Sequence, residues 1–121
     1  MATILLADDS SLVRTEMRSL LEGGGHTVLE ARSGLEALAF FSGKSSVQLV
    51  ITDVNMPEMD GLSFCQVLHA EPAFKNVPVF ALTTEISLEL KNAGKNAGVL
   101  LWIQKPPDSI MLLATIQKLL G

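Results

Sequence analysis

The sequence has few of the residues that mark extracellular, membrane-spanning or nucleic-acid-binding proteins. A single cysteine, Cys65, among 121 residues excludes an intrachain disulfide and is typical of a reducing compartment. Uninterrupted apolar runs reach only five residues, as at 99–103, which is far too short for a membrane span. Residues 1–7 lack the basic start and long apolar middle of a signal peptide. We therefore expect a cytoplasmic protein that does not contact the membrane.

Positive charge is also scarce. The 9 lysine and arginine residues are outnumbered by 13 aspartate and glutamate residues, so the formal net charge is −4, and no two basic residues are adjacent. Such a chain has little with which to neutralise phosphates, and we expect no direct binding to nucleic acid.

Aromatic residues make up only 5% of the chain, with no tyrosine, whereas hydrophobic residues make up 48%. These values predict an aliphatic core that needs no disulfide or metal, and the length suits one domain spanning residues 1–121. Cys65 lies in an apolar stretch with no obvious base nearby, so the sequence does not favour it as a nucleophile.

Five short runs rich in valine, isoleucine and leucine are bounded by turn or polar residues, and they predict strands buried on both faces. These runs are residues 4–7, 27–31, 48–52, 77–82 and 99–103. The segments between and after them fit helices, at 10–22, 34–41, 62–70, 87–96 and from Asp108 or Ser109 to Leu120. Gly94 interrupts the fourth helix at a cost of ~1 kcal/mol relative to alanine.

Strand and helix therefore alternate five times along the chain. This order predicts an α/β fold, with a doubly wound five-stranded parallel sheet covered by helices on both faces. Binding sites in such sheets form outside the carboxyl ends of the strands.

Chemically active residues follow four of the five predicted strands. They are Asp8 and Asp9, Asp53, Thr83 and Thr84, and Lys105. The second strand ends differently, at Glu30-Ala31-Arg32. If the other four strands are neighbours, these groups converge on one crevice.

The chemistry of this crevice follows from its charges. Three close carboxylates repel one another unless a cation joins them. Oxygen ligands alone favour Mg²⁺, with Mn²⁺ as a possible substitute, over zinc, because His26 and His69 do not follow a strand end. Lys105 offers a point charge and Thr83 a hydroxyl donor for phosphate oxygens. Together these groups predict a phosphoryl-transfer site with Asp53 as the nucleophile.

Each of these groups also has an ordinary structural explanation. An acidic pair after a strand often caps a helix, a lysine before proline is usually a solvated surface residue, and Thr83-Thr84 can begin a turn or helix. Ser10 can cap the first helix instead, which frees both carboxylates. Structural explanations must account for four strand ends at once, so we favour the phosphoryl-transfer site.

Four motifs then give the chain a close resemblance to bacterial response-regulator receiver domains of the single-domain chemotaxis type. They are Leu6-Ala7-Asp8-Asp9-Ser10 with Arg14 following, the Asp-x-x-Met-Pro-x-Met-Asp-Gly stretch at 53–61, Leu82-Thr83-Thr84, and Lys105-Pro106. The match covers nearly the whole chain. It implies the flavodoxin-like strand order 2-1-3-4-5.

The resemblance also implies a role for each residue of the site. Asp53 would accept a phosphoryl group from the phosphohistidine of a sensor histidine kinase or phosphotransfer protein. Asp9 and Asp53 would bind Mg²⁺ directly, Asp8 through water, and Asn55 through its backbone carbonyl. Thr83 and Lys105 would hold the phosphoryl oxygens.

The chain departs from the family pattern at two positions. Thr84 stands where a smaller residue is usual, and it is expected to narrow access to the phosphoryl group. Trp102, three residues before Lys105, replaces the usual tyrosine or phenylalanine; it is either a switch residue that turns inward or a core aromatic of the fifth strand. Asn55 and Glu85 occupy positions that tune dephosphorylation, and this polar pair predicts a short-lived phosphoryl group.

The last helix is apolar around much of its circumference, which predicts a binding face for a downstream protein beside the fifth strand. The function expected is therefore a phosphorylation switch, with no enzymatic activity beyond its own phosphorylation and dephosphorylation. One alternative is a receiver fragment of a longer hybrid kinase or transcription factor. Another is an aspartyl-phosphate phosphatase, but such enzymes have an aspartate where Asn55 stands and need a longer chain.

Overall fold

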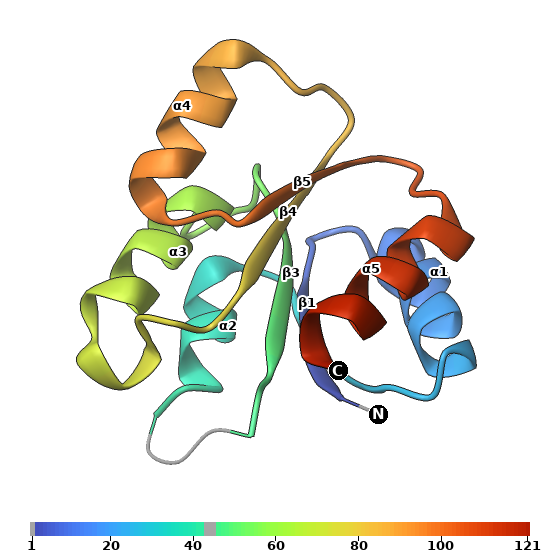
Figure 1. Cartoon of the computed structure of the whole chain (residues 1–121). Coiled ribbons are helices and arrows are strands. Elements are labelled where there is room, and N and C mark those ends of the chain that lie inside the picture. The colour runs from blue at the N-terminus through green and yellow to red at the C-terminus, as the bar shows by residue number, and fades with distance from the viewer. Residues whose placement is uncertain (1, 43–45) are drawn as a thin grey trace.

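The computed structural model describes residues 2–42 and 46–121, and in it strands and helices alternate along the chain (Figure 1). The strands are β1 (Thr3–Ala7), β2 (Thr27–Ala31), β3 (Leu49–Asp53), β4 (Val79–Thr83) and β5 (Leu101–Gln104). The helices are α1 (Ser11–Gly23), α2 (Gly34–Ala39), α3 (Gly61–Ala70), α4 (Leu88–Ala97) and α5 (Ser109–Leu120), with a short 3₁₀ helix η1 (Pro72–Phe74). In these described residues, no helix is both long and apolar enough to cross a bilayer.

All five strands are parallel and lie in the order β2-β1-β3-β4-β5, which confirms the predicted doubly wound α/β fold. The register pairs Ala7 of β1 with Thr52 of β3, and Asp53 with Leu82 of β4. Because the carboxyl ends of β1 and β3 are direct neighbours, the residues that follow β1 lie beside Asp53.

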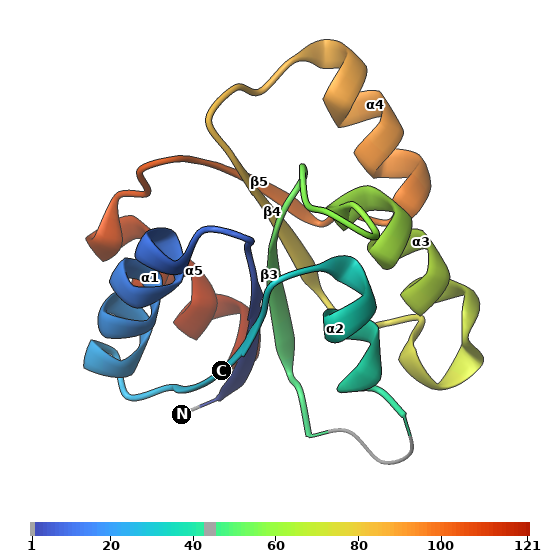
Figure 2. The ribbon, with the colours of Figure 1, turned by 180° about the vertical axis from the view of Figure 1, so that it is seen from behind.

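The helices form one layer on each face of the sheet. α1 and α5 cover one face, and α2, α3 and α4 cover the other (Figures 1 and 2). Consecutive β1 residues Leu5 and Leu6 are both fully buried, Leu5 toward the α2–α3–α4 layer and Leu6 toward the α1–α5 layer. This two-sided burial, shared by β3 and β4, is the reason that these strands appear in the sequence as continuous apolar runs. The prediction of burial on both faces is wrong for the edge strand β5, which has no buried residue.

Three strands, β3, β4 and β5, end one residue later in the structure than the sequence predicted. β3 includes Asp53 and β4 includes Thr83, so both residues close a strand instead of following one. β4 also begins later than predicted, at Val79, because Pro78 has no N–H to donate to the sheet. Asp53 and Thr83 are therefore held in sheet geometry.

A side-chain cap begins every α-helix. The five caps are Ser10, Ser33, Asp60, Ser87 and Asp108. Ser10 Oγ accepts the Val13 N–H at 3.3 Å, so neither Asp8 nor Asp9 is the N-cap of α1. The capping explanation for the acidic pair is thereby excluded.

Gly94, in the second turn of α4, has a packing role. It is buried, and a Cβ atom at this position would overlap Cζ2 of Trp102 and lie 3.2 Å from its Cε2. The indole of Trp102 on β5 thus lies directly against the α4 backbone. A glycine within a helix lowers its stability, but the absence of a side chain at Gly94 leaves room for the indole of Trp102.

We expect a Gly94→Ala substitution to displace the Trp102 indole and to change its fluorescence emission. Trp102 is the one tryptophan of the chain, so the emission reports on the surroundings of this side chain. The gain of up to ~1 kcal/mol in helix propensity offsets part of the lost packing. Asn92→Ala, at an exposed position of α4, is the control and should leave the emission unchanged. Equal spectra for Gly94→Ala and wild type would contradict the packing role.

Candidate functional site

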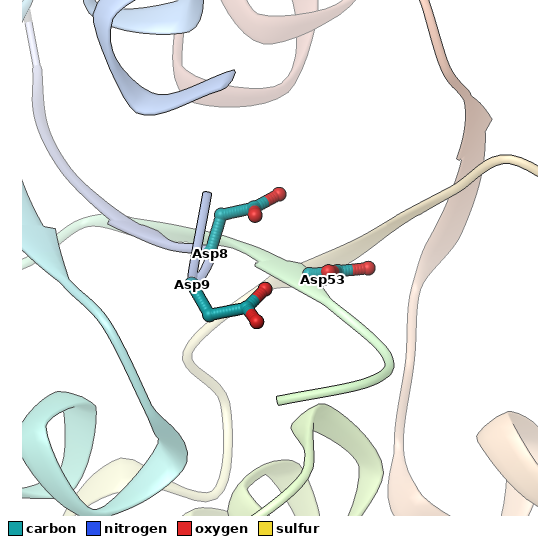
Figure 3. A group of neighbouring side chains, drawn as sticks. All are labelled: Asp8, Asp9 and Asp53. Carbon is teal, nitrogen blue, oxygen red and sulfur yellow. The ribbon is translucent and has the colours of Figure 1, made fainter. Parts of the chain in front are cut away.

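Three carboxylates meet at the carboxyl ends of β1 and β3. Asp8, Asp9 and Asp53 each offer an oxygen within 4.8 Å of the others, and Figure 3 shows their carboxylates directed to the same side. Asp8 is fully buried, Asp53 is partly exposed and Asp9 is exposed. The cluster therefore has one end in the protein and one end open to solvent.

Asp8 is fixed on several sides. Its Oδ1 accepts the Ser10 N–H at 2.9 Å, and its Oδ2 accepts a hydrogen bond from Lys105 Nζ at 2.8 Å. Its own N–H donates to the Ala31 carbonyl of β2 at 3.0 Å. A buried carboxylate needs such partners, and these hold it in one position.

Asp53 has one oxygen engaged locally and the other facing the cluster. Oδ1 accepts the Val54 N–H at 2.8 Å, and Oδ2 lies 3.4 Å from Lys105 Nζ. Burial raises the pKa of Asp53 and the charge of Asp8 raises it further, against the lowering effects of Lys105 and the Val54 N–H. Its ionised form therefore needs more positive charge than Lys105 supplies.

Lys105 places its ammonium between two carboxylates. Burial alone would lower its pKa, but the hydrogen bond to Asp8 and the charges of Asp53 and Asp8 outweigh this effect and raise it. The backbone N–H of Lys105 donates to the Thr83 carbonyl at 2.8 Å, which ties the residue to the end of β4. Lys105 thus remains a cation at the site.

Thr83 is buried at the end of β4, and its hydroxyl makes two long hydrogen bonds within its own loop. Oγ1 donates to the Glu85 carbonyl at 3.3 Å and accepts the Glu85 N–H at 3.4 Å. Thr84 and Glu85 are exposed. Thr84 and Lys105 both line a cavity of about 400 Å³ against α1.

The loop after Asp53 is held tightly against the strand. The Gly61 N–H donates to the Val54 carbonyl at 2.8 Å, and Glu58 adopts a positive φ of 67°. A Cβ atom at Gly61 would overlap the Asp53 carbonyl oxygen and lie 3.0 Å from Thr52 Oγ1. Asn55 is exposed in this loop, two residues after Asp53. The glycine of the motif therefore lets α3 begin directly against the β3 end.

Two residues weighed from the sequence lie away from the carboxylates. Trp102 is half-buried on β5 and packs on α4. Cys65 is buried in α3, where burial raises the pKa of its thiol to about 12. This value leaves almost no thiolate at neutral pH, so Cys65 does not act as a nucleophile.

The donor set suits a hard divalent cation. Among the residues that the structure describes, Asp8, Asp9 and Asp53 form the group with metal-ligating geometry, and all their ligand atoms are oxygens. The exposed side of the cluster leaves room for water, which Mg²⁺ retains when proteins bind it. The residues present therefore fit Mg²⁺ or Mn²⁺.

Comparison with known proteins agrees with this geometry. The family described as response regulator receiver domain matches residues 4–117. The chain belongs to this family.

Receiver domains of chemotaxis proteins are among its relatives. A CheY homologue of Campylobacter jejuni is 35% identical over 119 residues, which span 98% of this chain and 92% of that protein. The structure of CheY4 from Vibrio cholerae has a TM-score of 0.89 at 38% identity and covers 98% of both chains. The sensor histidine kinase CheAY of Helicobacter pylori is 32% identical over 116 residues, 95% of this chain but 14% of the kinase.

This receiver domain is thus a relative of the CheY response regulators of two-component phosphorelay signalling. Proteins of this kind generally bind Mg²⁺ and interact with histidine kinases and downstream targets. The flavodoxin-like architecture expected from the motifs is confirmed by these structural relatives.

Proposed function

We propose that Asp53 accepts a phosphoryl group from a phosphohistidine and that Asp8, Asp9 and Asp53 hold Mg²⁺ for this reaction. The observation that carries the proposal is the position of Asp53 at the carboxyl end of β3. There the Lys105 ammonium lies between Asp53 and the buried Asp8. A carboxylate oxygen of Asp53 forms the new bond to phosphorus while the bond from phosphorus to the histidine nitrogen breaks. Bound Mg²⁺ would neutralise charge on the phosphoryl oxygens, with the Asn55 carbonyl as a further ligand.

The remaining residues would stabilise the charge that develops during transfer. The Lys105 ammonium is already 3.4 Å from Asp53 Oδ2 and has only to turn toward the incoming phosphoryl oxygens. The Thr83 hydroxyl gives up only two long hydrogen bonds if it donates to the phosphoryl group. Both residues lie at ends of neighbouring strands, so small movements suffice.

We assign the whole chain, residues 1–121, to one receiver domain that catalyses only its own phosphorylation and dephosphorylation. Its phosphodonor would be a sensor histidine kinase or a phosphotransfer protein. With 13 acidic against 9 basic residues, the domain is not expected to bind nucleic acid.

The downstream partner would be a protein that binds the face formed by β5 and α5. Leu112 and Ile116 of α5 are buried in the core, whereas Ile110 and Met111 are 80% and 67% exposed. The exposed residues continue onto β5 at Leu101, beside Trp102. Such surplus apolar surface next to an edge strand favours protein binding.

The experiment that tests this function adds Mg²⁺ and acetyl phosphate to the wild-type protein and measures its intact mass. We expect the mass to increase by one phosphoryl group. In parallel, Mg²⁺ with beryllofluoride, an acyl-phosphate mimic, should change the Trp102 emission. A protein that gains no mass and shows no Mg²⁺-dependent response would refute the proposal.

The exposed pair Asn55 and Glu85 is expected to shorten the life of the phosphoryl group. These two polar side chains would orient the attacking water, so alanine at either position should slow decay several-fold. The measurement is the loss of protein-bound phosphate with time after the donor is removed. The control is Glu89→Ala, which removes an exposed carboxylate from α4. Unchanged decay in both Asn55→Ala and Glu85→Ala would contradict this tuning role.

A further inference from the structure

One arginine connects β2, a strand that gives no carboxylate to the cluster, with the acidic turn. Arg14 of α1 donates from Nη1 to the Asp8 backbone carbonyl at 2.8 Å and from Nε to Glu30 Oε1 at 3.0 Å. Glu30 is the next-to-last residue of β2, and the Arg14 side chain is only 13% exposed. Glu30, which makes the end of β2 differ from the ends of the other strands, is thus paired with Arg14.

We propose that Arg14 and Glu30 form a clamp that positions the Asp8–Asp9 turn and so sets the affinity for Mg²⁺. Arg14 is a positioning residue, because it touches the backbone of Asp8 and not the metal. The inference rests on the proposed Mg²⁺ site.

The clamp acts on the peptide bond that links the two metal-binding residues. This bond is planar, so fixing the Asp8 carbonyl oxygen also fixes the direction in which the chain continues to Asp9. The N–H of Asp8 is held separately by the Ala31 carbonyl at 3.0 Å. With both backbone groups of Asp8 engaged, the backbone that carries the two carboxylates is held in one orientation. Metal sites depend on such outer contacts to orient their ligands.

Glu30 gives the clamp its electrostatic balance. An unpaired guanidinium beside three carboxylates would compete with a divalent cation for them. The ion pair with Glu30 offsets this charge and leaves Nη1 of Arg14 free to donate to Asp8. The second oxygen of Glu30 pairs with Arg18, which binds the Val28 carbonyl at 3.1 Å instead of the acidic turn.

Arg18 is therefore a matched control for Arg14. Arg14→Met and Arg18→Met each remove one positive charge and one ion pair with Glu30, but only the first removes a contact to Asp8. The experiment titrates each variant and wild type with Mg²⁺ alone and follows heat and the amide shifts of Asp9 and Ser10. No phosphodonor is present.

We expect Arg14→Met to bind Mg²⁺ about ten-fold more weakly than wild type, within the usual range for lost outer-shell contacts. Arg18→Met should bind Mg²⁺ at least as tightly as wild type does. Removal of a positive charge by itself would strengthen cation binding, so weaker binding identifies a geometric effect. The metal-free amide shifts of Asp9 and Ser10 should move in Arg14→Met only.

Two results would overturn the clamp and leave the Mg²⁺ site intact: undiminished affinity in Arg14→Met, or equal losses in both variants. If wild type binds no Mg²⁺, the metal site fails and the clamp fails with it. Should Arg14→Met fold poorly, Arg14→Lys and Arg18→Lys replace the pair, because lysine keeps the charge but lacks the two-pronged donor. Equal affinities in the lysine variants would then overturn the clamp.

Discussion

An Asp53→Asn variant should fold but take up no phosphoryl group from acetyl phosphate. Asparagine has the same shape and keeps an oxygen for the Val54 N–H, but its amide is not a nucleophile toward phosphorus. The raised pKa of Asp53 means that its ionised form costs stability in the metal-free protein. This cost appears as the pH rises above the ordinary aspartate pKa and is complete above the raised one. At neutral pH the variant should therefore unfold at a higher urea concentration than wild type.

The matched control is Asp60→Asn in the same loop. Asp60 caps α3 by accepting the Ser63 N–H at 2.8 Å, a task that asparagine performs equally well. This variant should be phosphorylated like wild type, as judged by intact mass. If Asp53→Asn is still phosphorylated, or if Asp60→Asn is not, Asp53 is not the phosphoryl acceptor.

A Gly61→Ala substitution should have the largest effect on the fold. The new Cβ atom would overlap the backbone oxygen of Asp53 and approach Thr52 Oγ1, and a backbone atom in the central strand cannot turn away as a side chain can. Overpacking of this kind costs about 3 kcal/mol. The free energy of unfolding in urea measures the loss, and reduced phosphoryl uptake should accompany it because Asp53 is displaced.

Gly23→Ala is the matched control for this change. Gly23 ends α1, and a Cβ atom there meets nothing within 4 Å. Alanine should therefore stabilise this helix by up to ~1 kcal/mol. A Gly61→Ala protein as stable as wild type would contradict the close approach of the loop to β3.

The sequence was sufficient to predict the sheet because its inner strands β1, β3 and β4 are buried on both faces. Continuous apolar runs such as that of β1 leave little ambiguity, and alternation with helices then dictates parallel strands. The site followed for the same reason: Asp8, Asp53 and Lys105 each come at a strand end, and parallel strands end on one edge. The strand order depended on the family motifs, since periodicity does not determine it.

Contacts between distant segments were beyond sequence reasoning. Gly94 appeared as a weakness in a helix, because nothing local indicates that Trp102 packs against it. Glu30 appeared as an exception to the strand-end pattern, because its partner Arg14 lies 16 residues away on another element. The late ends of β3 and β4 depend on strand pairing, which propensity does not describe.

The position of Lys105 between Asp8 and Asp53 also bears on which ions the site accepts. Three carboxylates and one ammonium leave an excess of two negative charges in the cluster. A divalent ion brings this count to neutrality, whereas Na⁺ or K⁺ leaves a negative remainder and a trivalent ion leaves a positive one. In the proposed Mg²⁺ site the lysine would therefore favour divalent metals on charge alone, and replacing it with a neutral residue would shift that preference toward higher charge.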